Sequence, residues 1–439
     1  MRKPGGQGGR RLRLVAIADS DSYLKWAAAT LSALPADAEL VVVDTPVRPS
    51  PGQLAAAVQG SAITAEAVRV LALADVVARV ASVRPDAVLV ATRGPQARVL
   101  LRELARLDPR PALVTGLPGI SIPATSKALF FRHQADLLIV HSHREVREFR
   151  ALAAEGGAAR PIALAALPFA RAGAPPGEKV LRGPRGRDLV FAVQSRVPPD
   201  LGERRHLARI LLEAADADAA RRVVVKVRAV GRERQTHDER HPLPTLIARE
   251  AARAGRELPT NLVVSNAAMG EALETAEGLA TVSSTAAIEA IARGVPVLAL
   301  DTFGVSDALI NTVFEGSGLL GSADDLVKRR FRHPSAEWLH DNYFHASEDD
   351  ELADRLVQVC EARRRGELAP RDGLPVVGGE LRLRWQRLRA FPGSERAPVR
   401  ILVAAIGHPA HAAVRLARWV SRPLRMRTAA DRATGSYAP

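Results

Sequence analysis

Residues 281–300 read TVSSTAAIEAIARGVPVLAL, and the order of residue types in this stretch decides the class of fold. An apolar run ends at Val282, and three hydroxyl residues follow it. The next residues have helical character as far as Gly294, and a second apolar run occupies 295–300. A helix between two apolar strands is the repeating unit of a parallel sheet that helices cover on both faces. The stretch therefore predicts an α/β fold.

The same alternation of short apolar runs and helical stretches continues along the chain in two series. Each series predicts an open, doubly wound parallel sheet, and such sheets bind ligands at the carboxyl ends of their strands. Two sheets in tandem favour two Rossmann-like domains that face a cleft. The expected strands are Leu12–Ala18, Glu39–Asp44, Ala87–Ala91, Ala112–Thr115, Leu137–Val140 and Ile162–Leu164, then Asp188–Val193, Arg222–Val227, Asn261–Val264, Leu279–Val282 and Val295–Leu300.

Segments between and after the two series suggest where the domains end. Residues 168–187 are rich in proline, glycine and charge and lack periodicity, which indicates a linker. Acidic residues after Ser347 and arginines before Gly366 mark the two ends of one helix, which could close the second domain. The expected segments are a disordered tail at 1–10, a first Rossmann-like domain at 11–167, the linker at 168–187, a second Rossmann-like domain at 188–346, the closing helix at 347–366 and a basic extension at 367–439.

Composition excludes several classes of protein. The 439 residues are 47% hydrophobic, which suffices for two cores, and 4% aromatic, which argues against a stacking platform for single-stranded nucleic acid. The single cysteine, Cys360, excludes an intramolecular disulfide and suits a reducing compartment. No run is long enough to span a membrane, and the basic start lacks signal-peptide features, so a cytoplasmic protein is expected.

The formal net charge of +14 allows two interpretations. One is attraction to the phosphates of nucleotides, nucleic acid or anionic lipid, and the other is the arginine-rich composition of a GC-rich genome. Residues 409–427 leave a similar choice open. They could form a basic amphipathic helix that lies on a membrane surface, or an arginine-rich disordered tail.

The hydroxyl residues Ser283, Ser284 and Thr285 exceed what helix capping needs. They stand between an expected strand and an expected helix, where N–H groups and hydroxyls can bind an anion such as phosphate. Glu289 lies one turn into that helix, and its carboxylate could accept hydrogen bonds from both hydroxyls of a ribose. From spacing alone, an ordinary junction with a serine cap and a solvated glutamate is the better interpretation.

The segment 289–297, EAIARGVPV, resembles the donor-site helix of two-domain, GT-B type glycosyltransferases, whose pattern is roughly E-A-x-A-x-G-x-P-V. The preceding three hydroxyl residues resemble the serine motif of capsule-polysaccharide and sialyltransferase-like members, and the related segment of CDP-glycerol glycerophosphotransferases. The start of the chain, LVAIADSDSYLKWAAATL at 14–31, resembles an uncharacterised actinobacterial group of glycosyltransferases. The resemblance implies that Ser283, Ser284 and Thr285 hold the donor phosphate and that Glu289 holds the ribose.

Two further loops at expected strand ends carry candidate phosphate ligands. Lys226 and Arg228 stand where the resembling capsule-type enzymes have a Lys-Pro-His-Pro motif that contacts the donor phosphates. No His-Pro follows Lys226 directly and His237 lies eleven residues on, so the role of a histidine is open. Ser195 follows the first strand of the second series, where loops of GT-B enzymes often touch the donor phosphate. A plain surface loop is the alternative for both segments.

Asp19 and Asp21 follow the first expected strand and are the candidate general bases. An inverting transfer needs a group that takes the proton from the acceptor hydroxyl. The resemblance to sialyltransferase-like enzymes assigns this role to an acidic residue of the N-terminal domain. Asp21 equally suits a helix cap together with Ser22. Tyr23 and Lys25 are candidate contacts for the acceptor.

Loops after other strands of the first series supply further candidates for the cleft. Glycines in these loops allow a ligand to approach the backbone closely. His141 and His143 are spaced like metal ligands, but without an adjacent cysteine or acidic cluster they predict no metal site. We find no Walker loop, dinucleotide-binding glycine motif or G-x-S-x-G elbow. The candidate acceptor and cleft residues are Arg93, Gly94, Gly116, Gly119 and His141.

The residues and the resemblance together favour a metal-independent glycosyltransferase of hexosyl or sialyl type. It would move a sugar from a nucleotide-activated donor to a cell-envelope glycan or lipid-linked acceptor in polysaccharide biosynthesis. No cofactor is expected, because the nucleotide sugar is a substrate, and nucleic acid is not an expected partner. The basic extension would suit a peripheral location on the inner membrane face. Two alternatives stay open: a nucleotide-sugar 2-epimerase of the same fold, and a non-catalytic protein that binds polyanions or membranes.

Overall fold

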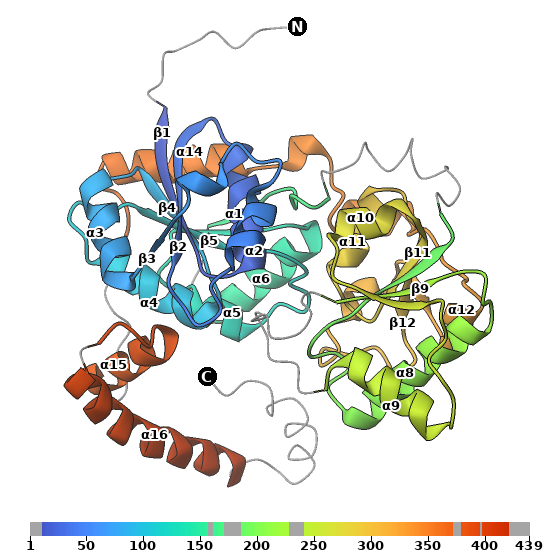
Figure 1. The fold of residues 1–439 in the computed structure, drawn as a ribbon. Helices are drawn as coiled ribbons and strands as arrows, with labels where there is room; N and C mark the ends of the chain where they lie inside the picture. The colour runs from blue at the N-terminus through green and yellow to red at the C-terminus, as the bar shows by residue number, and fades with distance from the viewer. Residues whose placement is uncertain are drawn as a thin grey trace, which may run out of the picture.

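Two parallel sheets organise the molecule, as the sequence predicts (Figure 1). The first has seven strands in the order β3-β2-β1-β4-β5-β6-β7, and the second has six in the order β10-β9-β8-β11-β12-β13. In both sheets the strand order reverses at the centre, which is the doubly wound topology. Sheets of this topology bind ligands in a crevice at the point of reversal. The computed structural model describes residues 11–156, 161–170, 186–227, 241–371, 379–395 and 397–420.

Helices cover both faces of the first sheet. Helices α1 and α2 pack on one face, α3 and α4 pack on the other, and α5 and α6 lie beside the edge that β6 and β7 form. The strands are apolar throughout because both of their faces are buried. The elements are β1 (Leu12–Ala18), α1 (Asp21–Ser32), β2 (Ala36–Val43), α2 (Pro51–Val58), η1 (Ala65–Ala67), β3 (Arg69–Leu71), α3 (Leu73–Val83), β4 (Ala87–Ala91), α4 (Gly94–Ala105), β5 (Ala112–Gly116), α5 (Ser126–Phe131), β6 (Leu137–Val140), α6 (His143–Glu155) and β7 (Ile162–Leu164).

The second sheet repeats this plan. Helices α8, α9 and α12 pack on one face, and α10, α11 and α13 pack on the other. The elements are β8 (Asp188–Ala192), α8 (Leu201–Asp216), β9 (Val223–Lys226), α9 (Leu243–Arg253), β10 (Leu262–Ser265), α10 (Met269–Glu274), β11 (Ala276–Thr281), α11 (Ala286–Ala292), β12 (Val297–Leu300), η2 (Thr312–Phe314), β13 (Leu320–Gly321), α12 (Ala323–Val327), α13 (Ala336–Asp341) and η3 (Ser347–Asp349).

Residues 281–300 and the strand before them form the predicted strand, helix and strand. β11 and β12 pair in parallel, with Leu279 opposite Val297, and α11 connects them. The helix ends before Gly294, whose φ of 71° is a left-handed conformation that glycine adopts without strain. The three hydroxyl residues therefore occupy the turn from strand to helix at the carboxyl edge of the second sheet.

The helix expected at 347–366 packs on the first sheet, so the expectation that it could close the second domain is wrong. After η3 the chain returns to the first domain, where the Glu351 amide donates to the Leu164 carbonyl at 2.9 Å. Helix α14 (Leu352–Arg364) then buries Leu352, Leu356 and Cys360 in the core on the α1 face of that sheet. Its start is five residues later than Ser347 suggested, because the acidic residues there form a 3-10 turn.

Two further helices follow and lie below the first domain in the view of Figure 1. Helix α15 (Gly379–Ala390) contacts α4 through an ion pair between Arg387 and Glu103. Helix α16 (Ala397–Val420) packs on α15. It covers the first part of the expected helix at 409–427 and starts twelve residues earlier. No helix among the described residues is both long and apolar enough to cross a membrane. The expected tail at 1–10, most of the linker and residues 421–439 lie outside the described residues.

Candidate functional site

Two contacts join the carboxyl ends of the two sheets. A Cβ atom added to Gly119, in the loop after β5, would stand 2.8 Å from Oγ1 of Thr285 at the start of α11. Lys25 on α1 places its Nζ 4.0 Å from Oε2 of Glu289 on α11 and 4.7 Å from the ring centre of Phe169. The start of α11 therefore faces the first domain, and the candidate donor residues Thr285 and Glu289 lie beside the candidate acceptor residues Lys25 and Gly119.

The three hydroxyl residues have different surroundings. Ser283 is buried, and its amide and hydroxyl both bond the side chain of Gln194, at 2.8 and 2.9 Å. Its hydroxyl thus connects the loops after β8 and β11. The hydroxyl of Ser284 accepts a hydrogen bond from the Ala286 amide at 3.2 Å and so caps the start of α11 locally. Of the three, Thr285 contacts the first domain.

Glu289 is held loosely by two cations. Its side chain is 13% exposed, and Nη2 of Arg293, one turn further along α11, lies 3.6 Å from its Oε1. The Lys25 contact is longer still, at 4.0 Å. Both distances exceed those of a hydrogen-bonded ion pair. Neither contact is therefore a tight ion pair.

The other predicted phosphate ligands lie at the ends of β8 and β9. Lys226 is the last residue of β9 and is buried, and its Nζ donates to the Val227 carbonyl at 2.6 Å. Ser195 lies after β8 in a half-buried loop. β8 and β9 are neighbours in the sheet, so both positions lie at one edge. Arg228 and His237 lie outside the described residues.

Arg204 on α8 is a structural residue that sequence reasoning missed. It is buried, and its guanidinium donates to the carbonyls of Gln194, Ser195 and His241 at 2.9 to 3.3 Å. These bonds fix the loop after β8 against the segment before α9. The only signal in the sequence was an arginine on the apolar side of a helix, because it lies among Leu207, Ala208 and Leu211 in the helical period.

Asp19, at the carboxyl end of β1, is fully buried. Its Oδ2 accepts from the Nε of Arg93 at 2.8 Å, and its Oδ1 accepts from the hydroxyl of Ser20 at 3.1 Å. Burial raises the pKa of Asp19, while the charge and hydrogen bonds of Arg93 lower it, and burial is the larger effect. Asp21 is the first residue of α1 and is half-buried, and Ser20 occupies the N-cap position.

Among the candidate glycines, two are explained by packing inside the first domain. A Cβ on Gly94 would collide with the ring of Phe131. A Cβ on Gly116 would stand 2.6 Å from the ring of Trp26. Gly119 differs from both, because its nearest neighbour belongs to the second domain.

His141 is a buried structural histidine. Its Nε2 accepts a hydrogen bond from the Trp26 indole at 2.9 Å, and its Nδ1 lies 2.8 Å from the carbonyl of Ala165, to which it must donate. Burial lowers the pKa of His141 to about 4, so the ring is neutral near pH 7. With both ring nitrogens occupied, His141 is a structural residue and does not offer a free group to a ligand.

A buried carboxyl group that sequence reasoning missed lies between the two domains. Glu145 on α6 accepts hydrogen bonds from the amides of Ser121 and His141, at 2.9 and 2.7 Å, and from the Tyr343 hydroxyl at 2.8 Å. Burial raises the pKa of Glu145 to about 7 although these three bonds favour the ionised form. Tyr343 belongs to the second domain, so this bond joins the domains through their interior.

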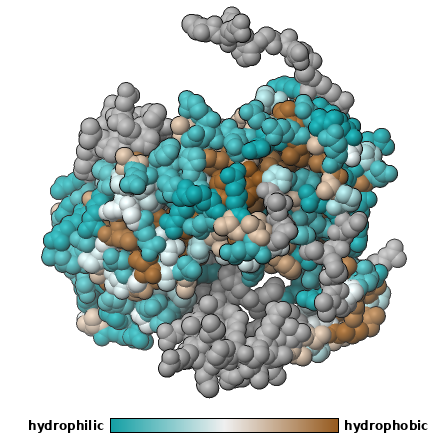
Figure 2. All heavy atoms as spheres, turned by 180° about the vertical axis from the view of Figure 1, so that it is seen from behind, coloured by the Kyte–Doolittle hydropathy of each residue, from teal (hydrophilic) through white to brown (hydrophobic). Residues whose placement is uncertain are grey.

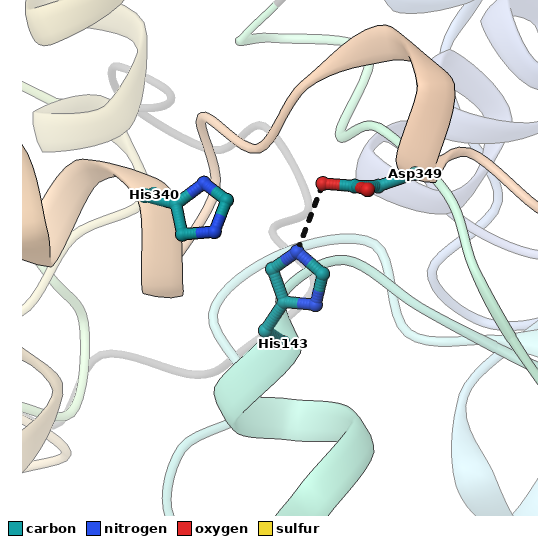
Figure 3. A group of neighbouring side chains, drawn as sticks. All are labelled: His143, His340 and Asp349. Carbon is teal, nitrogen blue, oxygen red and sulfur yellow. Dashed lines mark hydrogen bonds and ion pairs between the residues drawn. The ribbon is translucent and has the colours of Figure 1, made fainter.

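His143 at the start of α6 also has partners that its sequence neighbours do not reveal. The fold brings His340 of α13 and Asp349 of η3 to it (Figure 3). The expectation of no metal site considered only His141 and His143. The other two groups come from residues about 200 positions after His143, so the local spacing of His141 and His143 could not indicate this cluster.

Comparison of the sequence with known protein families identifies the family of this chain. Residues 14–359 match the model of the family described as "Putative glycosyltransferase (DUF6716)". The chain belongs to this family. The match spans both sheets and most of α14, so it includes every contact between the domains described above. No curated protein matches the chain. The capsule-polysaccharide and sialyltransferase-like resemblance stays a prediction.

Solved structures with a similar fold include sugar-nucleotide enzymes. UDP-N-acetylglucosamine 2-epimerase from Rickettsia bellii is 14% identical with a TM-score of 0.50, over 81% of this chain and 99% of its own. The epimerase from Methanocaldococcus jannaschii, in complex with UDP-GlcNAc and UDP, is 11% identical with a TM-score of 0.47, over 79% and 99%. Apo UGT2 from Phytolacca americana is 11% identical with a TM-score of 0.41, over 81% and 96%. The likeness concerns the fold, which is of the GT-B type.

Proposed function

We propose that this member of the glycosyltransferase family transfers a hexosyl or sialyl unit from a nucleotide-activated donor to a cell-envelope glycan or lipid-linked acceptor. The proposal rests on two contacts between the domains. Thr285 lies beside Gly119, and Glu289 lies near Lys25. These residues lie at the carboxyl edges of two parallel sheets, where α/β domains bind nucleotides. A donor bound on the second domain would present its sugar to the first domain.

The donor phosphates would bind at Ser284 and Thr285, with Lys25 and Lys226 as candidate cations. The departing nucleotide gains negative charge in the transition state, and fixed N–H dipoles and cations aimed at it lower the barrier. Because α11 has only seven residues, the hydroxyls and the amides of the turn contribute more than the helix dipole. In this scheme the transfer itself uses no metal ion.

Glu289 would bind the ribose. Its long contacts to Lys25 and Arg293 leave the carboxylate able to accept from two adjacent hydroxyls. A ribose there would replace weak ion pairs, which contribute about 0–1 kcal/mol each near a surface, with two charge-assisted hydrogen bonds. With the ribose bound to Glu289, Lys25 would turn towards the phosphates of the nucleotide.

The test is nucleotide binding by thermal shift, with CMP, CDP, UDP and GDP on the full chain. We expect one of them to raise the melting temperature, because a ligand present at 100 times its dissociation constant stabilises by about 2.7 kcal/mol. Glu289→Gln should lose most of this shift. The matched control is Glu274→Gln, since Glu274 is an exposed glutamate on α10 of the same domain. Failure of all four nucleotides to shift the wild-type protein would refute the donor site.

The reaction type is tested by incubation with the sugar nucleotide that binds. A transferase leaves the sugar configuration unchanged when no acceptor is present. An epimerase of the same fold would interconvert the sugar without an acceptor, and that result would replace our proposal by the epimerase alternative.

The surface of α16 supports a lipid-linked acceptor. Val403 packs on Trp385 of α15, whereas Ile401, Leu402 and Ile406 are 66%, 60% and 45% exposed. Figure 2 shows the apolar side chains of this region at the lower right. Exposed aliphatic residues on a helix within a basic extension suit a peripheral contact with anionic lipid. Co-sedimentation with vesicles that contain anionic lipid should weaken on Leu402→Asp, and equal binding by the variant would exclude this contact.

A further inference from the structure

Three side chains with metal-ligating groups converge where the second domain returns to the first. They are His143 of α6, His340 of α13 and Asp349 of η3, and one ligand atom of each lies within 4.8 Å of the others. Figure 3 shows the two imidazole rings and the carboxylate pointing toward one another from three separate elements. Nε2 of His143 is 3.1 Å from Oδ2 of Asp349, and the two histidine rings have centres 5.2 Å apart.

A third histidine, His345, lies beside this cluster. The ring of His345 lies 5.6 Å from the ring of His143. Its Nδ1 is 3.0 Å from the Ala346 carbonyl, to which it must donate, so its Nε2 carries the lone pair. That Nε2 is buried and has no hydrogen-bond partner within the described residues. A ring held by one nitrogen on a backbone carbonyl, with the other nitrogen free, is the usual state of a metal-binding histidine.

We propose that His143, His340 and Asp349 bind a divalent transition-metal ion, with Zn²⁺ as the best match. Imidazole nitrogens and a carboxylate oxygen are ligands that Zn²⁺ accepts, at about 2.0–2.2 Å. In a tetrahedral site such bonds place the ligand atoms about 3.4 Å apart. The pair formed by His143 and Asp349 is already close to this separation, and the exposed ring of His340 can move the remaining distance.

The charges around the cluster permit a cation. Both arginines of the adjacent turn of α6 have acidic partners: Arg147 pairs with Asp341 at 2.6 Å, and Arg144 pairs with Glu148 at 2.9 Å. Their positive charges are thus largely neutralised before an ion binds. Asp349 is the acidic residue that contacts a histidine of the cluster directly.

The position of the site indicates a structural role at the junction of the domains. His143 belongs to the first domain, His340 belongs to the second, and Asp349 lies on the segment that connects them. An ion bound by all three would fix the orientation of the domains at this second crossing of the chain. This inference does not depend on the proposed glycosyltransferase activity, because no donor or acceptor residue takes part.

The experiment is calorimetric titration of the chelator-treated full chain with ZnCl₂ near neutral pH. We expect one ion per chain, and at least about tenfold weaker binding for His340→Ala and for Asp349→Asn. The control is His206→Ala, because His206 is an exposed histidine on α8 that packs on Phe303 away from the cluster. Binding should also weaken in mild acid, since imidazole must be neutral to bind a metal.

The variants separate metal binding from a metal-free interaction between His143 and Asp349. His340 is exposed, so His340→Ala should keep the melting temperature of the metal-free protein while it loses Zn²⁺ affinity. No Zn²⁺ binding by the wild-type chain, or equal affinity of wild type and the His143→Ala/His340→Ala double variant, would overturn the proposal. Visible absorption by Co²⁺ offers a second readout, because a four-coordinate ion absorbs strongly and the double variant should lack the band.

Discussion

Single residues show how far a local sequence pattern determines the surroundings of a side chain. Thr285 and Glu289 were predicted from a local pattern, and the structure places both at the face of the second domain that meets the first. Ser283 belongs to the same pattern, yet its hydroxyl bonds Gln194, which lies 89 residues away. His141 bonds Trp26 across 115 residues. The state of a polar side chain depends on such distant partners, and local spacing contains no information about them.

Asp19 and Asp21 can be distinguished as bases by a pH–rate profile. A general base must be ionised, so the rate should rise with pH through the pKa of the base. Burial raises the pKa of Asp19, which moves this rise above the ordinary range of an aspartate. We expect Asp19→Asn to lower kcat by about 10²-fold or more and to abolish the acid limb. Nucleotide binding should persist, because Ser284, Thr285 and Glu289 lie on the other domain.

Asp21→Asn is the matched control for this prediction, since Asp21 is the other predicted base and is the half-buried first residue of α1. Asp19→Asn also removes the charged partner of Arg93, whose side chain is 22% exposed, and we expect a loss of about 1–3 kcal/mol of stability. A structural role alone would change the melting temperature and leave the acid limb in place. If both variants keep the wild-type profile, neither aspartate is the base.

At the scale of elements, the pattern of terminal charges predicted one late helix but not where it packs. The charges at both ends of 347–366 indicated a helix, and α14 exists with Leu352 and Leu356 buried. Its partner could not be predicted, because an apolar stripe fits either sheet equally well. Neighbours in sequence suggested the second domain, whereas the chain crosses back at Glu351 and covers the first. The short edge strand β3 escaped prediction because its three residues are largely exposed.

Glu250 connects helices α8 and α9 and gives a prediction about acid stability. Its carboxylate accepts from Arg205 and Arg209 of α8 and from Arg253 of α9, at 2.6 to 3.1 Å. Hydrogen bonds from Arg205 first, with those from Arg253 and Arg209, lower the pKa of Glu250 to about 2 from its usual value of 4.5. A lowered pKa means that the network stabilises the fold above pH 4.5 and that this contribution disappears as the pH falls towards 2.

We therefore expect Glu250→Gln to lower the free energy of unfolding at pH 7 by about 0.5–1 kcal/mol. The expected loss of stability is small because the side chains of Arg205, Arg209 and Arg253 are 37% to 57% exposed and water screens their charges. At pH 2–3 the difference from wild type should shrink. Denaturant unfolding at both pH values measures this, with the exposed Glu257→Gln as control. A loss that is equal at pH 7 and pH 2–3 would show that the charge of Glu250 does not matter.

At the scale of the whole molecule, the sequence predicted two sheets in tandem and the GT-B arrangement. The contacts that decide how the sheets face each other were not predicted. Gly119 against Thr285, Glu145 with Tyr343, and the cluster around His143 each join segments that are more than 150 residues apart. The chain also returns to the first domain, because α14 packs in the first core after the second domain is complete. The first domain therefore depends on chain from both sides of the linker.

The return of α14 can be followed through Cys360, the single cysteine of the chain. Its thiol is buried in the first core, and burial raises its pKa to about 11. A thiol reagent needs both access and the thiolate, so labelling of the native protein should be slow and should report the detachment of α14. Leu356→Ala removes a buried side chain from the same interface. Such a change costs about 2–5 kcal/mol, so labelling should accelerate at least about tenfold.

Val357→Ala is the matched control, because Val357 is the next residue on α14 and is 42% exposed. It shortens a side chain of the same helix without changing the contact with the first sheet, so its labelling rate should equal that of wild type. Equal acceleration by both variants would mean that general loosening of the helix exposes Cys360. Rapid labelling of the wild-type protein would mean that α14 does not stay on the first domain. Slow labelling that Leu356→Ala alone accelerates would establish that the segment after the second domain completes the core of the first.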